Sequence, residues 1–147
     1  LNNEIISSTL SKSLIANYEF DKANAMLGYD YFFSGIVERG NNRGSALGFP
    51  TANIKYSENL IDINGVFATE TVIENIKYKS ISHIGHIPTF NMFNKIIETH
   101  ILNFNKNIYG AEIFVSPKKF IRKIIKFNSI DELKKQIIID IDNIVKE

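Results

Sequence analysis

Six stretches rich in β-branched and aromatic residues fill the middle of this 147-residue chain. They cover residues 31–38, 51–56, 66–73, 76–84, 96–104 and 111–127, and each is typical of a β-strand. Only Glu74 and Asn75 separate the third stretch from the fourth, which predicts a hairpin. Short strands that follow one another in this way favour an all-β core, a closed or nearly closed antiparallel barrel.

Both ends of the chain carry helical patterns instead. Residues 1–30 contain apolar residues at helical spacing, and Gly28 stands where such a helix would end. Near the other end, Ser129 and Glu132 have the spacing of a capping box. Apolar residues then follow at helical intervals: Ile130, Leu133, Ile137, Ile141 and Ile144. We expect the last helix to bury this apolar stripe against the barrel.

Composition argues against several classes of protein. The formal net charge of +1 argues against a dedicated nucleic-acid surface. The absence of cysteine excludes disulfides and thiolate zinc sites and fits a reducing compartment. No apolar run approaches the roughly 20 residues of a membrane span, and the N-terminus has no signal-peptide pattern. We therefore expect a cytoplasmic protein that binds neither nucleic acid nor membrane.

A glycine-rich loop lies between the first two predicted strands. Gly40, Gly44 and Gly48 lead into the sequence Pro-Thr-Ala-Asn, and glycine lets backbone approach a bulky ligand closely. If the residues after this loop form a strand, Thr51 and Asn53 point to the same face. Such a loop beside two neutral oxygen ligands suits a magnesium–nucleotide phosphate site. An ordinary β-hairpin connection explains the glycines equally well, and no Walker or protein-kinase motif is present.

Glu98 lies inside the apolar stretch 96–102, where an unpartnered carboxylate is costly to bury. Partial burial would raise its pKa and make it suitable as a general base. An exposed glutamate on an edge strand is the equal alternative.

Two other groups of residues favour ordinary structural roles. The three histidines, His83, His86 and His100, have no spacing suited to a metal site, so we favour packing or hydrogen bonding for them. The basic segment 118–123 would attract phosphate, but a solvated strand face explains it more simply.

In combination, these motifs resemble the riboflavin kinase family, specifically the kinase module of bacterial bifunctional riboflavin kinase/FAD synthetases. The order of the motifs carries the resemblance: Gly-x-x-Arg-Gly-x-x-Leu-Gly-Phe-Pro-Thr-Ala-Asn over residues 40–53, Pro-Thr-Phe over 88–90, Glu-Thr-His-Ile-Leu over 98–102, Tyr-Gly at 109–110 and Ile-Arg at 121–122. It extends over residues 31–142, and its most specific parts are Leu-Gly-Phe-Pro-Thr-Ala-Asn and Glu-Thr-His.

The resemblance implies a six-stranded Greek-key barrel of the riboflavin kinase type, with flanking N- and C-terminal helices. The implied reaction transfers the γ-phosphate of ATP to the 5′-hydroxyl of riboflavin and gives FMN. Glu98 would be the base, and Thr51 and Asn53 would contact Mg²⁺. The other binding residues implied, with ATP at the glycine loop and flavin near the arginine of the last strand, are Gly40, Arg43, Gly44, Gly48, Phe49, Pro50, Tyr109 and Arg122.

Residues 6–9 and 23–28 resemble the end of the adenylyltransferase domain and the linker helix of the bifunctional enzymes. We therefore expect residues 1–30 to be a helical linker or remnant of that domain and residues 31–147 to be the kinase domain. An upstream adenylyltransferase domain is the expected covalent partner, and FAD synthesis by this chain alone is not expected.

Four residues depart from the usual family pattern: His83, Ile87, Asn103 and Ile124. An impaired or non-enzymatic flavin- or nucleotide-binding module is therefore the alternative to an active kinase. A barrel that binds single-stranded nucleic acid is disfavoured, because the chain lacks a basic groove with interleaved aromatic residues.

Overall fold

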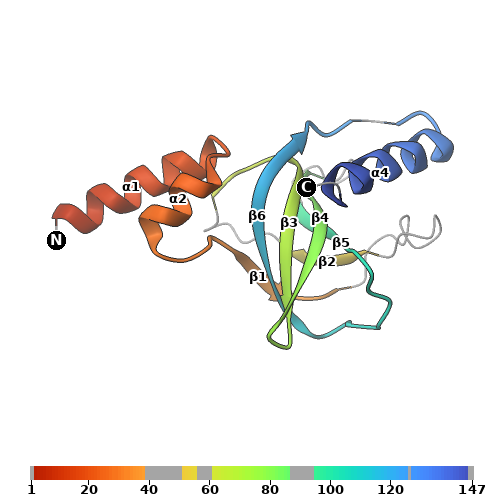
Figure 1. The fold of residues 1–147 in the computed structure, drawn as a ribbon, viewed down its shortest axis with the longest axis horizontal. Coiled ribbons are helices and arrows are strands. Elements are labelled where there is room, and N and C mark those ends of the chain that lie inside the picture. The colour runs from red at the N-terminus through yellow and green to blue at the C-terminus, as the bar shows by residue number, and fades with distance from the viewer. Residues whose placement is uncertain (1, 39–50, 56–60, 87–94, 126, 146–147) are drawn as a thin grey trace.

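The structure of the protein, a computed structural model, describes residues 2–38, 51–55, 61–86, 95–125 and 127–145. Within these ranges the chain forms six strands and three helices arranged around one barrel (Figure 1). The strands are β1 (Phe33–Ile36), β2 (Ala52–Lys55), β3 (Gly65–Ile73), β4 (Ile76–His86), β5 (Lys95–Ile101) and β6 (Glu112–Arg122). The helices are α1 (Asn2–Ala16), α2 (Phe20–Leu27) and α4 (Ile130–Val145).

The six strands form one antiparallel sheet in the order β1-β6-β3-β4-β5-β2. Just beyond β1, the backbone N–H of Glu38 donates to the carbonyl of Asn53 in β2 at 2.7 Å. This bridge brings the two edge strands together, so the sheet curls into a nearly closed barrel. The predicted six-stranded antiparallel barrel is confirmed.

The hairpin between β3 and β4 is also confirmed. Glu74 and Asn75 both have positive φ, 50° and 67°, as a two-residue hairpin turn that matches the strand twist requires. Three predicted strands extend too far by more than one residue, however. β1 covers only Phe33–Ile36 of the predicted residues 31–38. β5 ends at Ile101, and Asn103 just beyond it has left-handed backbone (φ 56°). β6 ends at Arg122, because its partner strand begins at Gly65 and Val66 provides the last pair.

Of the two N-terminal helices, α2 packs against the barrel at β6 and α1 packs against α2 (Figure 1). Gly28 caps α2 with left-handed backbone (φ 81°), as predicted. Ile15 and Phe20 are almost completely buried, and they belong to the same apolar cluster as Phe33 and Phe67 inside the barrel. The helical segment from Ile15 onward is therefore part of the folded barrel core.

The C-terminal helix α4 covers part of the outer face of the sheet. Half of the predicted capping box is present at its start, since Ser129 Oγ accepts the N–H of Glu132 at 3.2 Å. The Glu132 carboxylate accepts the N–H of Asn128 at 3.2 Å instead of completing the box at Ser129. Ile144 and Ile141 pack in a second apolar cluster with Val66 and Ile81 of the sheet, so this part of the predicted isoleucine stripe is buried as expected. Among the described residues, no helix has both the length and the apolar character needed to cross a membrane.

Candidate active site

The antiparallel pairing of β2 with β5 brings three of the predicted site residues together. Asn53 of β2 lies directly opposite Glu98 of β5, so their side chains share one face of the sheet. Thr51 lies two residues before Asn53, and its hydroxyl donates to Glu98 Oε1 at 3.1 Å. The expectation that the hydroxyl and the amide share a face is therefore met, and the carboxylate lies on that face too.

Glu98 is not the exposed edge-strand glutamate of the alternative interpretation. Its strand β5 lies between β4 and β2, and the residue is half-buried. Asn53 beside it is only 7% exposed. A carboxylate that is held by a hydroxyl donor and partly shielded from water suits a general base.

The row of paired residues continues across the barrel beyond Glu98. His83 of β4 lies opposite Glu98, Val66 of β3 lies opposite His83, and Arg122 of β6 lies opposite Val66. Val66 packs with Ile144 of α4, which shows that this row is on the outer face of the sheet. Arg122 and Glu98 are thus on the same surface, separated by two strands.

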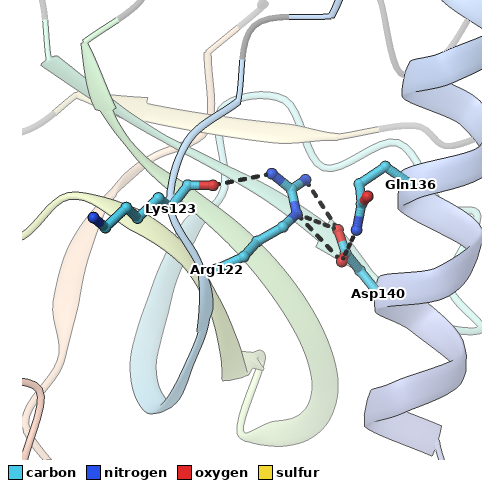
Figure 2. A network of polar contacts seen from close by, with 4 residues as sticks. All are labelled: Arg122, Lys123, Gln136 and Asp140. Carbon is cyan, nitrogen blue, oxygen red and sulfur yellow. Dashed lines mark hydrogen bonds and ion pairs between the residues drawn. The ribbon is translucent and has the colours of Figure 1, made fainter.

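The guanidinium of Arg122 is held by helix α4 (Figure 2). Its Nε and Nη2 lie 3.1 Å and 3.0 Å from Oδ2 of Asp140, a residue only 2% exposed. Gln136 donates to Oδ1 of the same carboxylate at 3.0 Å, and Arg122 Nη1 donates to the carbonyl of Lys123 at 3.2 Å. The Arg122 ion pair therefore joins α4 to β6 beside the row that contains Glu98.

Asp140 is the buried partner of Arg122, and the sequence analysis did not identify it. The signal was present, because Asp140 is an acidic residue within the apolar run 137–141 of a helix. On a helix that packs against a strand ending in Arg122, such a residue indicates a buried partner for that cation.

Tyr109 lies on the connection before β6 and is 46% exposed. The next residue, Gly110, donates its N–H to the carbonyl of Val37 at 2.9 Å, and Glu38 in turn pairs with Asn53. Residues 37–38 thus bridge the backbone at Gly110 and the backbone at Asn53.

The remaining predicted binding residues lie outside the described ranges: Gly40, Arg43, Gly44, Gly48, Phe49 and Pro50. The same is true of Ile87, one of the departures from the family pattern. Another departure, Ile124, is 39% exposed, and its side chain lies against Gly85 of β4.

The donor set at Thr51 and Asn53 fits a hard divalent cation that also binds phosphate. Mg²⁺ prefers oxygen ligands and in nucleotide sites usually keeps water and substrate phosphates as ligands, so the Thr51 hydroxyl and the Asn53 amide oxygen would supply two neutral oxygen ligands from the protein. A histidine metal site receives no support, since the described part of the chain contains no cluster of three or more potential His, Cys, Asp or Glu ligands.

The fold and the site define a small antiparallel β-barrel with a hydroxyl, an amide and a carboxylate gathered on its outer face. A family model described as "Flavokinase: Riboflavin kinase" matches residues 27–146. The chain belongs to the riboflavin kinase family.

Individual relatives agree with this assignment. A bifunctional riboflavin kinase/FMN adenylyltransferase from Bacillus subtilis is 37% identical over 136 residues, which cover 90% of this chain and 43% of that protein. The chain spans less than half the length of the first curated relatives it matches.

Two solved structures have the same fold. The structure of a riboflavin kinase from Trypanosoma brucei aligns with this chain at a TM-score of 0.57 and 26% sequence identity. The alignment covers 78% of this chain and 74% of the T. brucei chain. A Streptococcus pneumoniae structure titled as a macrolide-efflux protein has a TM-score of 0.82 at 31% identity, over 92% of this chain and 45% of that one.

Proposed function

We propose that this module is a magnesium-dependent riboflavin kinase that transfers the γ-phosphate of ATP to the 5′-hydroxyl of riboflavin and gives FMN. One observation carries the proposal: the Glu98 carboxylate lies opposite Asn53 and accepts a hydrogen bond from Thr51. Membership of the riboflavin kinase family supports the choice of substrates.

Glu98 receives the proton in this reaction. As the 5′-oxygen of riboflavin forms its bond to the γ-phosphorus, the hydroxyl proton moves to the Glu98 carboxylate. The bond between the γ-phosphorus and its bridging oxygen breaks, and ADP leaves with that electron pair. Most of the catalytic effect in phosphoryl transfer comes from positioning and charge neutralisation, so one well-placed carboxylate is sufficient for the proton.

Thr51 and Asn53 hold the metal in this proposal. Bound Mg²⁺ would neutralise phosphate charge, with the threonine hydroxyl oxygen and the asparagine amide oxygen as protein ligands. The Thr51 hydroxyl donates its hydrogen bond to Glu98, so its oxygen lone pairs are left for a cation.

The binding roles of the other residues rest on the family resemblance. We assign ATP to the glycine loop and its continuation: Gly40, Arg43, Gly44, Gly48, Phe49 and Pro50. We assign riboflavin to the side of Tyr109 and Arg122. Because Asp140 already engages the Arg122 guanidinium, we propose that Arg122 contributes to the flavin site mainly by fixing α4 and the end of β6.

The wider context of the module is also proposed by analogy. The printed name of the B. subtilis relative includes an FMN adenylyltransferase activity, and this chain covers 43% of that protein. We propose that residues 1–30 connect the kinase domain, residues 31–147, to such a domain. ATP as substrate and the absence of cysteine favour a cytoplasmic location.

Incubation of the purified protein with ATP, magnesium and riboflavin tests the proposal, with FMN measured by chromatography. We expect FMN to accumulate with ADP and to stop when EDTA removes the metal. Riboflavin or nucleotide binding without any FMN above a no-enzyme blank would instead favour the non-enzymatic binding module.

A further inference from the structure

Five hydroxyl side chains form a continuous hydrogen-bonded chain inside the barrel. The bonds run from Thr71 to Ser80 at 2.7 Å, from Ser80 to Thr69 at 2.7 Å, from Thr69 to Ser82 at 2.8 Å and from Ser82 to Thr99 at 2.8 Å. All five residues are at most 5% exposed. We call this set the hydroxyl ladder; it connects β3, β4 and β5 from the inside.

The ladder reverses the usual pattern of a barrel strand. In β4, Ser80 and Ser82 face the interior, whereas Ile81 between them faces outward and packs with Ile144 of α4. Between Ser80 and Ser82 the interior face of β4 is therefore polar, and apolar burial on this face comes only from its flanks, at Tyr78 and Ile84. A slip by one residue would turn Ile81 inward and leave the buried hydroxyls of the ladder without partners, which is unfavourable.

One end of the ladder lies directly behind the candidate active site. Thr99 follows Glu98 in β5 and faces the opposite side of the strand. Across the sheet, Thr99 pairs with Ala52, the residue between Thr51 and Asn53. The other end, Thr71, lies across the sheet from Tyr78, near the β3–β4 turn at Glu74 and Asn75.

We propose that Thr99 and Ser82 are positioning residues for the phosphotransfer site. Their hydroxyl bond ties β5 to β4 directly behind Glu98, and this limits movement of the strand segment whose carboxylate reaches Thr51 and lies opposite Asn53. The inference rests on the proposed kinase activity. Catalytic groups must be held to within a fraction of an ångström by a supporting shell, and the Ser82–Thr99 bond provides that support from the interior.

Substitution of Thr99 by Val tests this, with Thr71→Val as the matched control. Both changes remove one terminal hydroxyl of the ladder while keeping the side-chain shape, so their thermal stabilities should fall by similar amounts. Misplacement of a catalytic group costs up to about 100-fold in rate. We expect Thr99→Val to lower kcat by about tenfold or more with little change in the KM for ATP, and Thr71→Val to change kcat by less than about twofold.

Thr99→Ser keeps the hydroxyl and is expected to restore most of the lost kcat, while Ser82→Ala should resemble Thr99→Val. The proposal is overturned if Thr99→Val retains wild-type kcat, or if Thr71→Val lowers kcat as much as Thr99→Val does. Should Thr99→Val fail to fold, Ser82→Ala takes its place. A Ser82→Ala variant with wild-type kcat, or with no greater loss of kcat than Thr71→Val, then overturns the proposal. An inactive wild-type protein would contradict the kinase proposal itself, and the two failures are thus distinguishable.

Discussion

At the scale of single residues, Tyr31 packs partly buried against the barrel core. Burial raises the pKa of its hydroxyl above the usual value of 10.0, and the nearby backbone of Ile61 opposes this only in part. Among the described residues, the Tyr31 hydroxyl has no hydrogen-bond partner of good geometry. The folded state therefore favours the neutral phenol.

This predicts how Tyr31→Phe changes the pH dependence of stability. Because the folded-state pKa is raised, the wild type loses stability as pH rises from about 10 toward that pKa, and the variant lacks this loss. At pH 7, removing a buried hydroxyl without a partner should leave the free energy of unfolding unchanged or raise it by about 1 kcal/mol. Urea denaturation at pH 7 and pH 10.5 checks this. A stability difference in favour of Tyr31→Phe that is smaller at pH 10.5 than at pH 7 would contradict this prediction.

Sequence patterns predicted individual site residues where two strands of clear pattern pair. The sequence already indicated Thr51 and Asn53 on one face and Glu98 within an apolar strand, and the register brings them together. The hydroxyl ladder and His83 beside Glu98 were not predicted. Their placement depends on which residues of β3, β4 and β5 pair, and a single sequence does not reveal pairing register.

At the scale of elements, the Arg122–Asp140 ion pair is expected to hold α4 on the barrel. The side chains are 17% and 3% exposed, respectively, so removal of one partner leaves a poorly solvated charge. We predict that Asp140→Asn lowers the free energy of unfolding by about 3 kcal/mol in urea titrations. Asp131→Asn, an exposed change in the first turn of the same helix, should cost less than about 1 kcal/mol.

A paired substitution separates the charge from the packing. Replacing both partners by apolar residues, Arg122→Met with Asp140→Leu, should recover most of the stability lost in Asp140→Asn, because no unpaired charge remains. Equal stability of Asp140→Asn and the wild type would show that the ion pair does not secure α4.

The existence of each strand was predictable, but several strand ends were not. Alternation and β-branched residues marked all six strands, whereas the ends at Ile101 and Arg122 depend on tertiary structure. Residues 123–127 still read as strand in isolation, but β3 offers no partner beyond Val66. Similarly, the left-handed conformation of Asn103 is not evident from its β-rich surroundings.

At the scale of the whole molecule, the N-terminal helices are expected to unfold together with the barrel. Phe20 contacts the ring of Phe67 edge-on at a centroid distance of 5.8 Å and is 1% exposed. We predict that Phe20→Ala destabilises the entire module by about 4 kcal/mol. Leu10→Ala, at a position 46% exposed on α1, should cost less than about 1 kcal/mol.

Near-UV circular dichroism of the barrel aromatic residues during urea unfolding distinguishes cooperative unfolding of helices and barrel from independent unfolding of the helices. A barrel transition unaffected by Phe20→Ala would mean that residues 1–30 form an independent appendage.

The overall architecture was predictable because the strand pattern and the helical ends are distinct. The shared core was not, since the sequence gives no indication of which barrel residues Ile15 and Phe20 meet.

The rate of FMN formation by Glu98→Gln, compared with the wild type and with Glu112→Gln, tests the central claim most directly. Glu112 is an exposed glutamate on β6 opposite Ile36, so its change should leave turnover intact. Loss of the proton acceptor should lower kcat by about 100-fold to 10,000-fold in Glu98→Gln, while ATP still binds. A Glu98→Gln variant that forms FMN at near wild-type rates would contradict the proposed role of Glu98.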